Sequence, residues 1–377
     1  MNIKVHIKTL AANRQLWLLM GIFFLVQAVL FYKTGVVTTL EAEKYIREGT
    51  SLATGGTLTE TRFIFYLPVI LLIAFCRLLH LPFECAVLVQ VLFSAVALYS
   101  FYRVALHLSS KKWALGISIV LAGCIPIQEW NMYLYSDSLF ISISVIFFSL
   151  LYFCSINNKF RWWVFVLLPL VWCFARPAGL LFVLPLFILL LAARARNKIY
   201  IMGLLAAMLA MVLFAAAYFN GGGDLDTLKP YIEEHIICFV PQNEAGAQLN
   251  IVHTGNQLND LVYYIVHNPG HFGSLLFKKI VSFFNLTRPW YSSAHNLALM
   301  VFMVPLYLFF LPGMIYLFRY RRAFAWFAAS VLVIYPLGVA MQCDDWHSRF
   351  TMPVLPLMIL IAFYGLYMMI RKKRKQP

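Results

Sequence analysis

A small set of carboxylates and cations in this chain has the residue types needed for proton transfer and phosphate chemistry. Glu41 and Asp137 each lie near the start of a predicted helix, and a carboxylate there can take the proton of a hydroxyl. Arg176, His347 and Arg349 lie beside apolar segments, where cations stabilise a departing phosphate. Together these residues predict group transfer from a phosphate-bearing substrate.

Each of these residues also has a structural interpretation. Glu41 lies in the first turn of a helix that Thr39 can cap, and the positive helix end favours a carboxylate there. Ser136 or Asp137 can itself cap the following helix. Arg176 can extend towards the surface or pair with a carboxylate such as Asp137. The sequence leaves both interpretations open.

Further candidates accompany these residues. Lys44 and Glu48 are four residues apart, which predicts a solvated surface ion pair on the helix that begins near Glu41. Tyr45 has the same spacing from Glu41 and is a candidate substrate-binding residue. Two more candidates for phosphate binding, Arg288 and His295, lie among aromatic residues in a long loop. Cys238 and Cys343 could pair, although spacing alone cannot establish a disulfide.

The elements that must position these residues are transmembrane helices. Of the 377 residues, 62% are hydrophobic and 12% are charged, which predicts an all-α polytopic membrane protein. The net charge of +15 is spread over short loops, which disfavours nucleic-acid binding. Ten crossings are expected, at 16–33, 84–107, 113–128, 138–156, 162–175, 178–193, 199–219, 299–318, 323–341 and 353–370.

Charge sidedness sets the expected orientation. Loops such as Lys111–Lys112, Arg319–Arg322 and the C-terminal tail are basic, so they are predicted to be cytoplasmic. The carboxylates, including Asp344 and Asp345, then mark the outer face. This pattern holds only if the apolar segment 63–80 does not cross, so we predict a re-entrant or surface-lying segment beside a cavity.

The expected organisation has three parts. Residues 1–219 form a core of seven transmembrane helices that includes the first outer loop, 34–83. Residues 220–298 form a second large extracytoplasmic loop, and residues 299–377 form three further helices with a basic cytoplasmic tail. The expected location is a bacterial inner membrane, with the site facing the periplasm or outside.

In order and sidedness, the short motifs resemble those of the GT-C glycosyltransferases. The motifs are Glu41 four residues before Tyr45, then Tyr135-Ser136-Asp137, Arg176-Pro177 and Arg349-Phe350-Thr351-Met352-Pro353. In layout the chain is similar to bacterial relatives of protein mannosyltransferases and aminoarabinose transferases. The resemblance implies a GT-C-like bundle that takes a sugar from a polyprenyl-phosphate carrier, with Glu41 as general base where many relatives have aspartate.

The implied reaction has a membrane-lipid donor and a hydroxyl acceptor. The acceptor is a lipid-linked glycan, an envelope glycan or a protein, and inversion at the anomeric carbon is expected. Asp137 would orient the sugar or acceptor, while Tyr45, Arg176, Arg288, His295, His347 and Arg349 would bind substrate or its phosphate. No cofactor is required, and no metal-ligand spacing supports a divalent ion between Glu41 and Asp137.

Two other functions fit the same composition. A lipid or small-molecule transporter or flippase would also have many crossings, although here the ionisable residues lie at the outer rim and no two halves match. A structural subunit with a degenerate site is the second alternative. Replacing Glu41 separates these functions, because only an enzyme should lose turnover.

Overall fold

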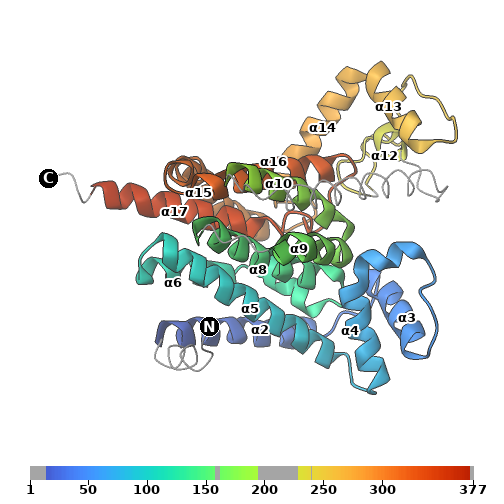
Figure 1. Cartoon of the computed structure of the whole chain (residues 1–377). Coiled ribbons are helices and arrows are strands. Elements are labelled where there is room, and N and C mark those ends of the chain that lie inside the picture. The colour runs from blue at the N-terminus through green and yellow to red at the C-terminus, as the bar shows by residue number, and fades with distance from the viewer. Residues whose placement is uncertain (1–13, 158–161, 194–227, 239, 374–377) are drawn as a thin grey trace.

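The computed structural model describes residues 14–157, 162–193, 228–238 and 240–373, and Figure 1 shows the whole chain. These residues form helices together with three isolated β-bridges, so the predicted all-α class is confirmed. The predicted crossing at 199–219 and the basic residues 194–198 lie outside the described residues.

Six described helical segments are long and apolar enough to cross a membrane. They are α2 (Arg14–Thr34), the segment Thr61–Leu78, α5 (Glu84–Leu108), α8 (Ser136–Asn157), α15 (Ser293–Tyr320) and α16 (Arg322–Ala340). A seventh span results if the helices Lys111–Ala122 and Ile125–Met132, whose axes are bent by 59° relative to each other, are counted as one. A multi-pass membrane protein is therefore confirmed, whereas the described helices do not establish all ten predicted crossings.

The remaining apolar helices are shorter. They are α9 (Trp162–Ala175), η3 (Pro177–Phe182) with α10 (Val183–Ala192), and α17 (Leu355–Lys373). The turn between α9 and η3 is buried, because Arg176 is 5% exposed. Gly179 makes this turn possible, since a Cβ there would collide with the backbone carbonyl of Trp172. The predicted crossings at 162–175 and 178–193 thus correspond to two short apolar helical segments joined by a buried turn.

The two ends of the bundle differ. Figure 1 shows the N-terminal end of α2 and the C-terminal end of α17 at the left, and the non-bundle helices at the opposite end. The latter are α3 (Glu41–Ala53), α4 (Leu67–Leu78), α12 (Lys229–Ile232), α13 (Gln257–His267) and α14 (Pro269–Phe284). The acidic loops thus lie together at one end of the molecule. The alternation of basic and acidic loops along the sequence predicts this arrangement.

The segment Thr61–Leu78 combines two properties. Its length and composition would allow it to cross a membrane. Figure 1 nevertheless shows α4 lying across the direction of α2 and packed beside α3. This direction is the one expected of a surface-lying segment in the first outer loop.

Two local predictions about α3 are wrong. Leu40, with φ of 58°, precedes the helix and no side chain caps it, so Thr39 is not the cap. Glu48 is fully buried and accepts hydrogen bonds from Thr59 through the backbone nitrogen at 2.8 Å and the hydroxyl at 2.6 Å. The loop after α3 folds back and supplies these donors, so Glu48 is not the surface partner of Lys44.

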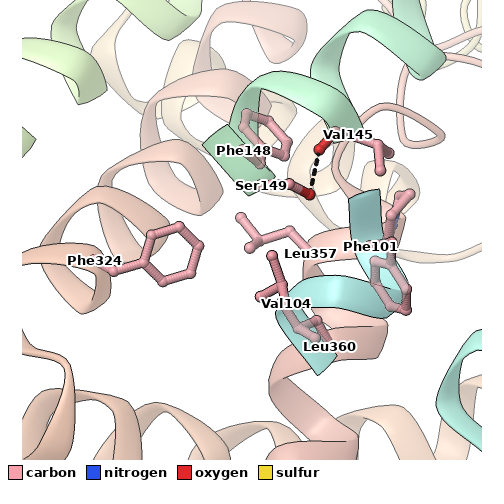
Figure 2. Close-up of a pocket in the computed structure, with 9 residues that line it drawn as sticks. Phe101, Val104, Val145, Phe148, Ser149, Phe324, Leu357 and Leu360 are labelled. Atoms are coloured by element: carbon pink, nitrogen blue, oxygen red, sulfur yellow. Dashed lines mark hydrogen bonds between the residues drawn. The ribbon is translucent and has the colours of Figure 1, made fainter. Parts of the chain in front are cut away.

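The bundle core is densely packed with aromatic rings. Phe182 stacks on Tyr335 with 4.8 Å between ring centroids, and Trp172 packs against both Phe182 and Phe148. Figure 2 shows the small apolar void between α5, α8, α16 and α17, of about 20 Å³. Ser149, the polar residue on its wall, donates to the Val145 carbonyl of its own helix at 2.8 Å. We interpret this void as a packing gap, since its polar group is already satisfied.

A disulfide ties the loop after α12 to the loop between α16 and α17. Cys238 and Cys343 are bonded, with 5.1 Å between their Cα atoms, which answers the question that the sequence left open. Beside the disulfide, the Cys238 amide donates to the Asp344 carbonyl at 2.8 Å and the Asp344 amide donates to the Ile236 carbonyl at 2.9 Å. The segment before α17 is thereby anchored at the acidic end.

Candidate functional site

Four charged residues from four separate elements meet at the acidic end of the bundle. Glu41 comes from the first turn of α3, Asp137 from the first turn of α8, Arg176 from the turn between α9 and η3, and Arg349 from the loop before α17. We call these four residues the charge cluster. The sequence analysis singled out all four, and the fold brings them together.

Arg349 binds Glu41 with both of its terminal nitrogens. Nη1 lies 2.7 Å from Oε2 and Nη2 lies 3.1 Å from Oε1, which is the parallel geometry that makes arginine–carboxylate pairs strong. Lys44 approaches the same carboxylate, with Nζ 3.4 Å from Oε1. The structural partner of Glu41 is therefore a cation 308 residues away, in addition to the end of its own helix.

Asp137 lies between the two guanidinium groups. Its Oδ1 accepts from Arg176 Nη1, and its Oδ2 lies 3.9 Å from Arg349 Nη1. That Oδ2 has no hydrogen-bond partner among the described residues. The structural interpretation of Arg176, pairing with Asp137, is confirmed. The helix begins at Ser136, so Asp137 lies in its first turn.

Two further residues complete the electrostatics of the charge cluster. The ring of Phe350 lies 4.7 Å from the Arg176 Cζ and 5.3 Å from the Arg349 Cζ, so one aromatic ring contacts both cations. Asp345 Oδ2 lies 3.0 Å from Arg349 Nε. Three carboxylates (Glu41, Asp137, Asp345) thus balance three cations (Lys44, Arg176, Arg349), and the region is neutral overall.

Arg349 suppresses the basicity of Glu41. Burial by itself raises the pKa of Glu41, but hydrogen bonds and charge from Arg349, helped by Lys44 and Arg176, outweigh burial and lower the pKa to about 2. The neighbouring phenol of Tyr45 is almost fully buried, and burial together with the Glu41 charge raises its pKa. In this state Glu41 is an anion and Tyr45 is neutral.

Two of the predicted phosphate-binding residues lie at a different place. A cavity of about 640 Å³ lies at the break between α6 (Lys111–Ala122) and α7 (Ile125–Gln128), and we call it the α6–α7 cavity. His295 and His347 line it on either side of Tyr291. The Tyr291 hydroxyl lies 3.1 Å from His347 Nδ1, and the Tyr291 and His295 rings stack at 4.4 Å. Neither histidine belongs to the charge cluster.

Arg288 lies apart from both regions. It is buried, its Nη2 lies 2.5 Å from Asp344 Oδ2, and its Nη1 donates to the carbonyls of Asn285 at 2.6 Å and Thr287 at 3.1 Å. These contacts brace the loop that carries Arg349. A phosphate at Arg288 would have to displace them.

Sequence reasoning missed several residues. Asp345, Glu129 and Ser348 belong to the two regions just described, and Lys279 is buried with its ammonium 4.4 Å from the Tyr231 ring. The sequence could have indicated Asp345, because its spacing of four residues from Arg349 allows the two side chains to form an ion pair. Across the described ranges, no group of three or more His, Cys, Asp or Glu residues is arranged to hold a metal ion.

Comparisons with protein-family models, with curated proteins and with solved structures found no match to this chain. The function of the site must therefore be argued from its own geometry and charge.

Proposed function

We propose that this chain is an integral membrane glycosyltransferase of GT-C type. It transfers a sugar from a polyprenyl-phosphate carrier to a hydroxyl acceptor on the extracytoplasmic face, with inversion at the anomeric carbon. The observation that supports this most is the charge cluster, in which a carboxylate able to act as base is bound by a guanidinium able to bind phosphate.

The proposed reaction needs one base and one phosphate site. Glu41 removes the proton of the acceptor hydroxyl, and the oxygen forms a bond to the anomeric carbon of the sugar. The bond from that carbon to the phosphate oxygen breaks, and its electron pair leaves with the polyprenyl phosphate. Arg349 and Arg176 stabilise the charge that develops on the leaving phosphate.

The pairing of Arg349 explains how a carboxylate of low pKa can serve as base. The phosphodiester of the donor carries a negative charge and competes with Glu41 for the same guanidinium fork. When phosphate takes Arg349, Glu41 loses its strongest partner and its pKa rises towards that of an ordinary buried carboxyl. Donor binding therefore activates the base, and Glu41 stays inert while the site is empty.

The proposed topology keeps about ten crossings and an outward-facing site. The shorter helices α9, α10 and α17 would supply three of the additional crossings, and the crossing predicted at 199–219 lies outside the described residues. The Cys238–Cys343 disulfide supports the orientation, because disulfides persist mainly in oxidising compartments. In a bacterium this side is the periplasm.

A matched pair of α3 variants tests the proposal. Purified chain in liposomes is assayed with a panel of polyprenyl-phosphate sugars and the glycans or lipids of the membrane it comes from. Glu41→Gln should reduce turnover by about 10²–10⁴-fold, the usual contribution of a general base. Glu43→Gln alters an exposed carboxylate of the same helix and should leave turnover unchanged.

The affinity for the donor provides a second measurement on the same variants. Because a neutral amide in place of the Glu41 carboxylate no longer competes as an anion for Arg349, Glu41→Gln should bind a polyprenyl phosphate more tightly while losing turnover. Equal turnover in the two variants would reject the proposal. Undiminished translocation of the sugar lipid by Glu41→Gln, without any glycosylated product from the unmodified chain, would favour a flippase.

A further inference from the structure

The α6–α7 cavity has the size and lining of a ligand site. Ligand pockets commonly measure about 300–1,000 Å³ and combine apolar walls with a few convergent polar groups. This cavity of about 640 Å³ is walled by Val120, Gly123, Cys124, Ile125, Pro126, Leu286, Ala298, Leu299, Phe302 and Met352. Its polar residues are Glu129, Tyr291, His295, His347 and Ser348.

The break between α6 and α7 forms one side of the cavity. The two helices meet at 59° and Gly123 lies between them. Irregular backbone at membrane depth is stable only where it is packed in protein or lines a cavity. Ile125 is 46% exposed on the outer surface of this break, and Leu297 and Val301 of α15 are also exposed. The cavity thus has exposed apolar surface beside it.

Two polar groups of this cavity lack partners among the described residues. The Glu129 carboxylate has no hydrogen bond or ion pair to any of them. The hydroxyl of Ser348 is buried and also has no hydrogen-bond partner there. Ser348 has a φ of 53°, a region that non-glycine residues rarely adopt and that is often kept at functional sites. A buried polar group without a hydrogen-bond partner lowers the stability of the folded protein. A ligand that forms hydrogen bonds with such a group would recover this free energy.

The cavity and the charge cluster share one segment of chain. His347 and Ser348 line the cavity, and the next residue, Arg349, binds Glu41. A molecule held in the cavity would therefore lie on the other side of this segment from the proposed donor phosphate. Two binding regions that meet at one segment are what a transfer between two lipid-embedded substrates requires.

We propose that the α6–α7 cavity binds the acceptor, an amphipathic lipid with a hydroxyl-rich, uncharged headgroup. This inference rests on the proposed function. Glu129 can accept hydrogen bonds from hydroxyls, and no arginine or lysine is among the described residues that line this cavity, whereas the charge cluster offers two guanidinium groups to a phosphate. The stacked rings of Tyr291 and His295 offer an aromatic face to a sugar, and the apolar walls receive the alkyl chain.

Photo-crosslinking in proteoliposomes tests the assignment without requiring turnover. Two probes carry the same diazirine-bearing alkyl chain, one with a glucoside headgroup and one with a phosphate headgroup, and labelled peptides are mapped by mass spectrometry. The glucoside probe should label residues 120–126 and 298–302 in a saturable manner. Glu129→Gln should weaken its half-saturation about tenfold, as expected when one hydrogen bond to the ligand is lost.

Two substitutions on α15 distinguish the cavity from general lipid contact. Ala298→Trp fills the cavity and should abolish labelling there, whereas Val301→Trp lies outside the lining and should not. Equal labelling in both variants, or equal labelling by the phosphate probe, would overturn the proposal. Glu41→Gln should leave labelling unchanged. Specific labelling by a chain without transferase activity would reject the proposed function and retain this site.

Discussion

The charge cluster and the α6–α7 cavity share one loop, but the polar side chains of the cluster are paired with one another whereas two of those in the cavity are not. In the charge cluster, Glu41 is bound by Arg349 and Asp137 by Arg176, so opposite charges neutralise one another. In the cavity, the carboxylate of Glu129 and the hydroxyl of Ser348 have no hydrogen-bond partner among the described residues.

The difference shows that paired and unpaired polar groups contribute differently to the stability of the protein and to ligand binding. A cluster of ion pairs is stable, but a competing ion must displace Arg349 before the Glu41 carboxylate can act as base. An unpaired polar lining costs stability but needs no rearrangement to receive a ligand. The following predictions test this contrast, from the largest expected effect to the smallest.

Removing one member of a buried pair in the charge cluster should be the most destabilising change. Arg176→Met leaves the buried Asp137 carboxylate without its hydrogen-bonded partner, with only Arg349 Nη1 at 3.9 Å, and should lower the free energy of unfolding by about 3 kcal/mol. Equilibrium unfolding in mixed micelles measures this loss. The double variant Arg176→Met/Asp137→Leu should recover most of it. If the double variant is no better than the single one, the pair is not what stabilises this region.

Opening the Cys238–Cys343 disulfide should affect both regions together, because both use the loop that follows Cys343. The variant with serine at both positions should lose about 2–4 kcal/mol, as is typical of native disulfides. Phosphate binding at Arg349 and glucoside labelling of the cavity should weaken in parallel. Cys85→Ser, a free cysteine at the start of α5, is the control and should change neither.

The pH dependence of kcat/KM and of kcat should show whether donor binding releases Glu41 from Arg349. In the free protein its pKa is about 2, below the ordinary value of 4.5, so its ion pair contributes fully to stability above pH 4.5 and is lost as the pH falls towards 2. The acid limb of kcat/KM, which reports the free protein, should therefore lie at lower pH than the acid limb of kcat. Arg349→Lys, which lacks the fork, should bring the two limbs closer. Identical limbs in the unmodified chain would contradict release of the base by the donor.

Changes inside the cavity should have small effects on stability. Glu129→Gln removes no internal partner and should change the free energy of unfolding by less than about 0.5 kcal/mol. Ser348→Gly relieves the left-handed backbone conformation that Ser348→Ala retains, so the glycine variant should be more stable by about 1 kcal/mol. A loss of more than about 0.5 kcal/mol in the free energy of unfolding of Glu129→Gln, or any loss of stability in Ser348→Gly, would show that the cavity lining is part of a packed network.

Several features followed from the sequence because they depend on local pattern. Runs of apolar residues identified α2, α5, α8, α15 and α16, and also the shorter helices α9 and α10. Charge type and outer-loop position also selected Glu41, Asp137 and Arg349. The surface pair of Glu48 was mispredicted because the loop around Thr59, distant along the chain, returns to bind it. The cap at Thr39 was mispredicted because Leu40, with a positive φ, lies between Thr39 and the helix.

The membrane class and the separation of acidic from basic loops were determined by the sequence itself, since hydropathy and charge act over a single helix length and need no knowledge of neighbours. Only the tertiary structure decided that Arg349 pairs with Glu41 and that His347, two residues earlier, lies at a separate cavity. The reason is physical: which ions pair depends on distances of a few ångströms between helices, and helix packing sets those distances between residues hundreds of positions apart.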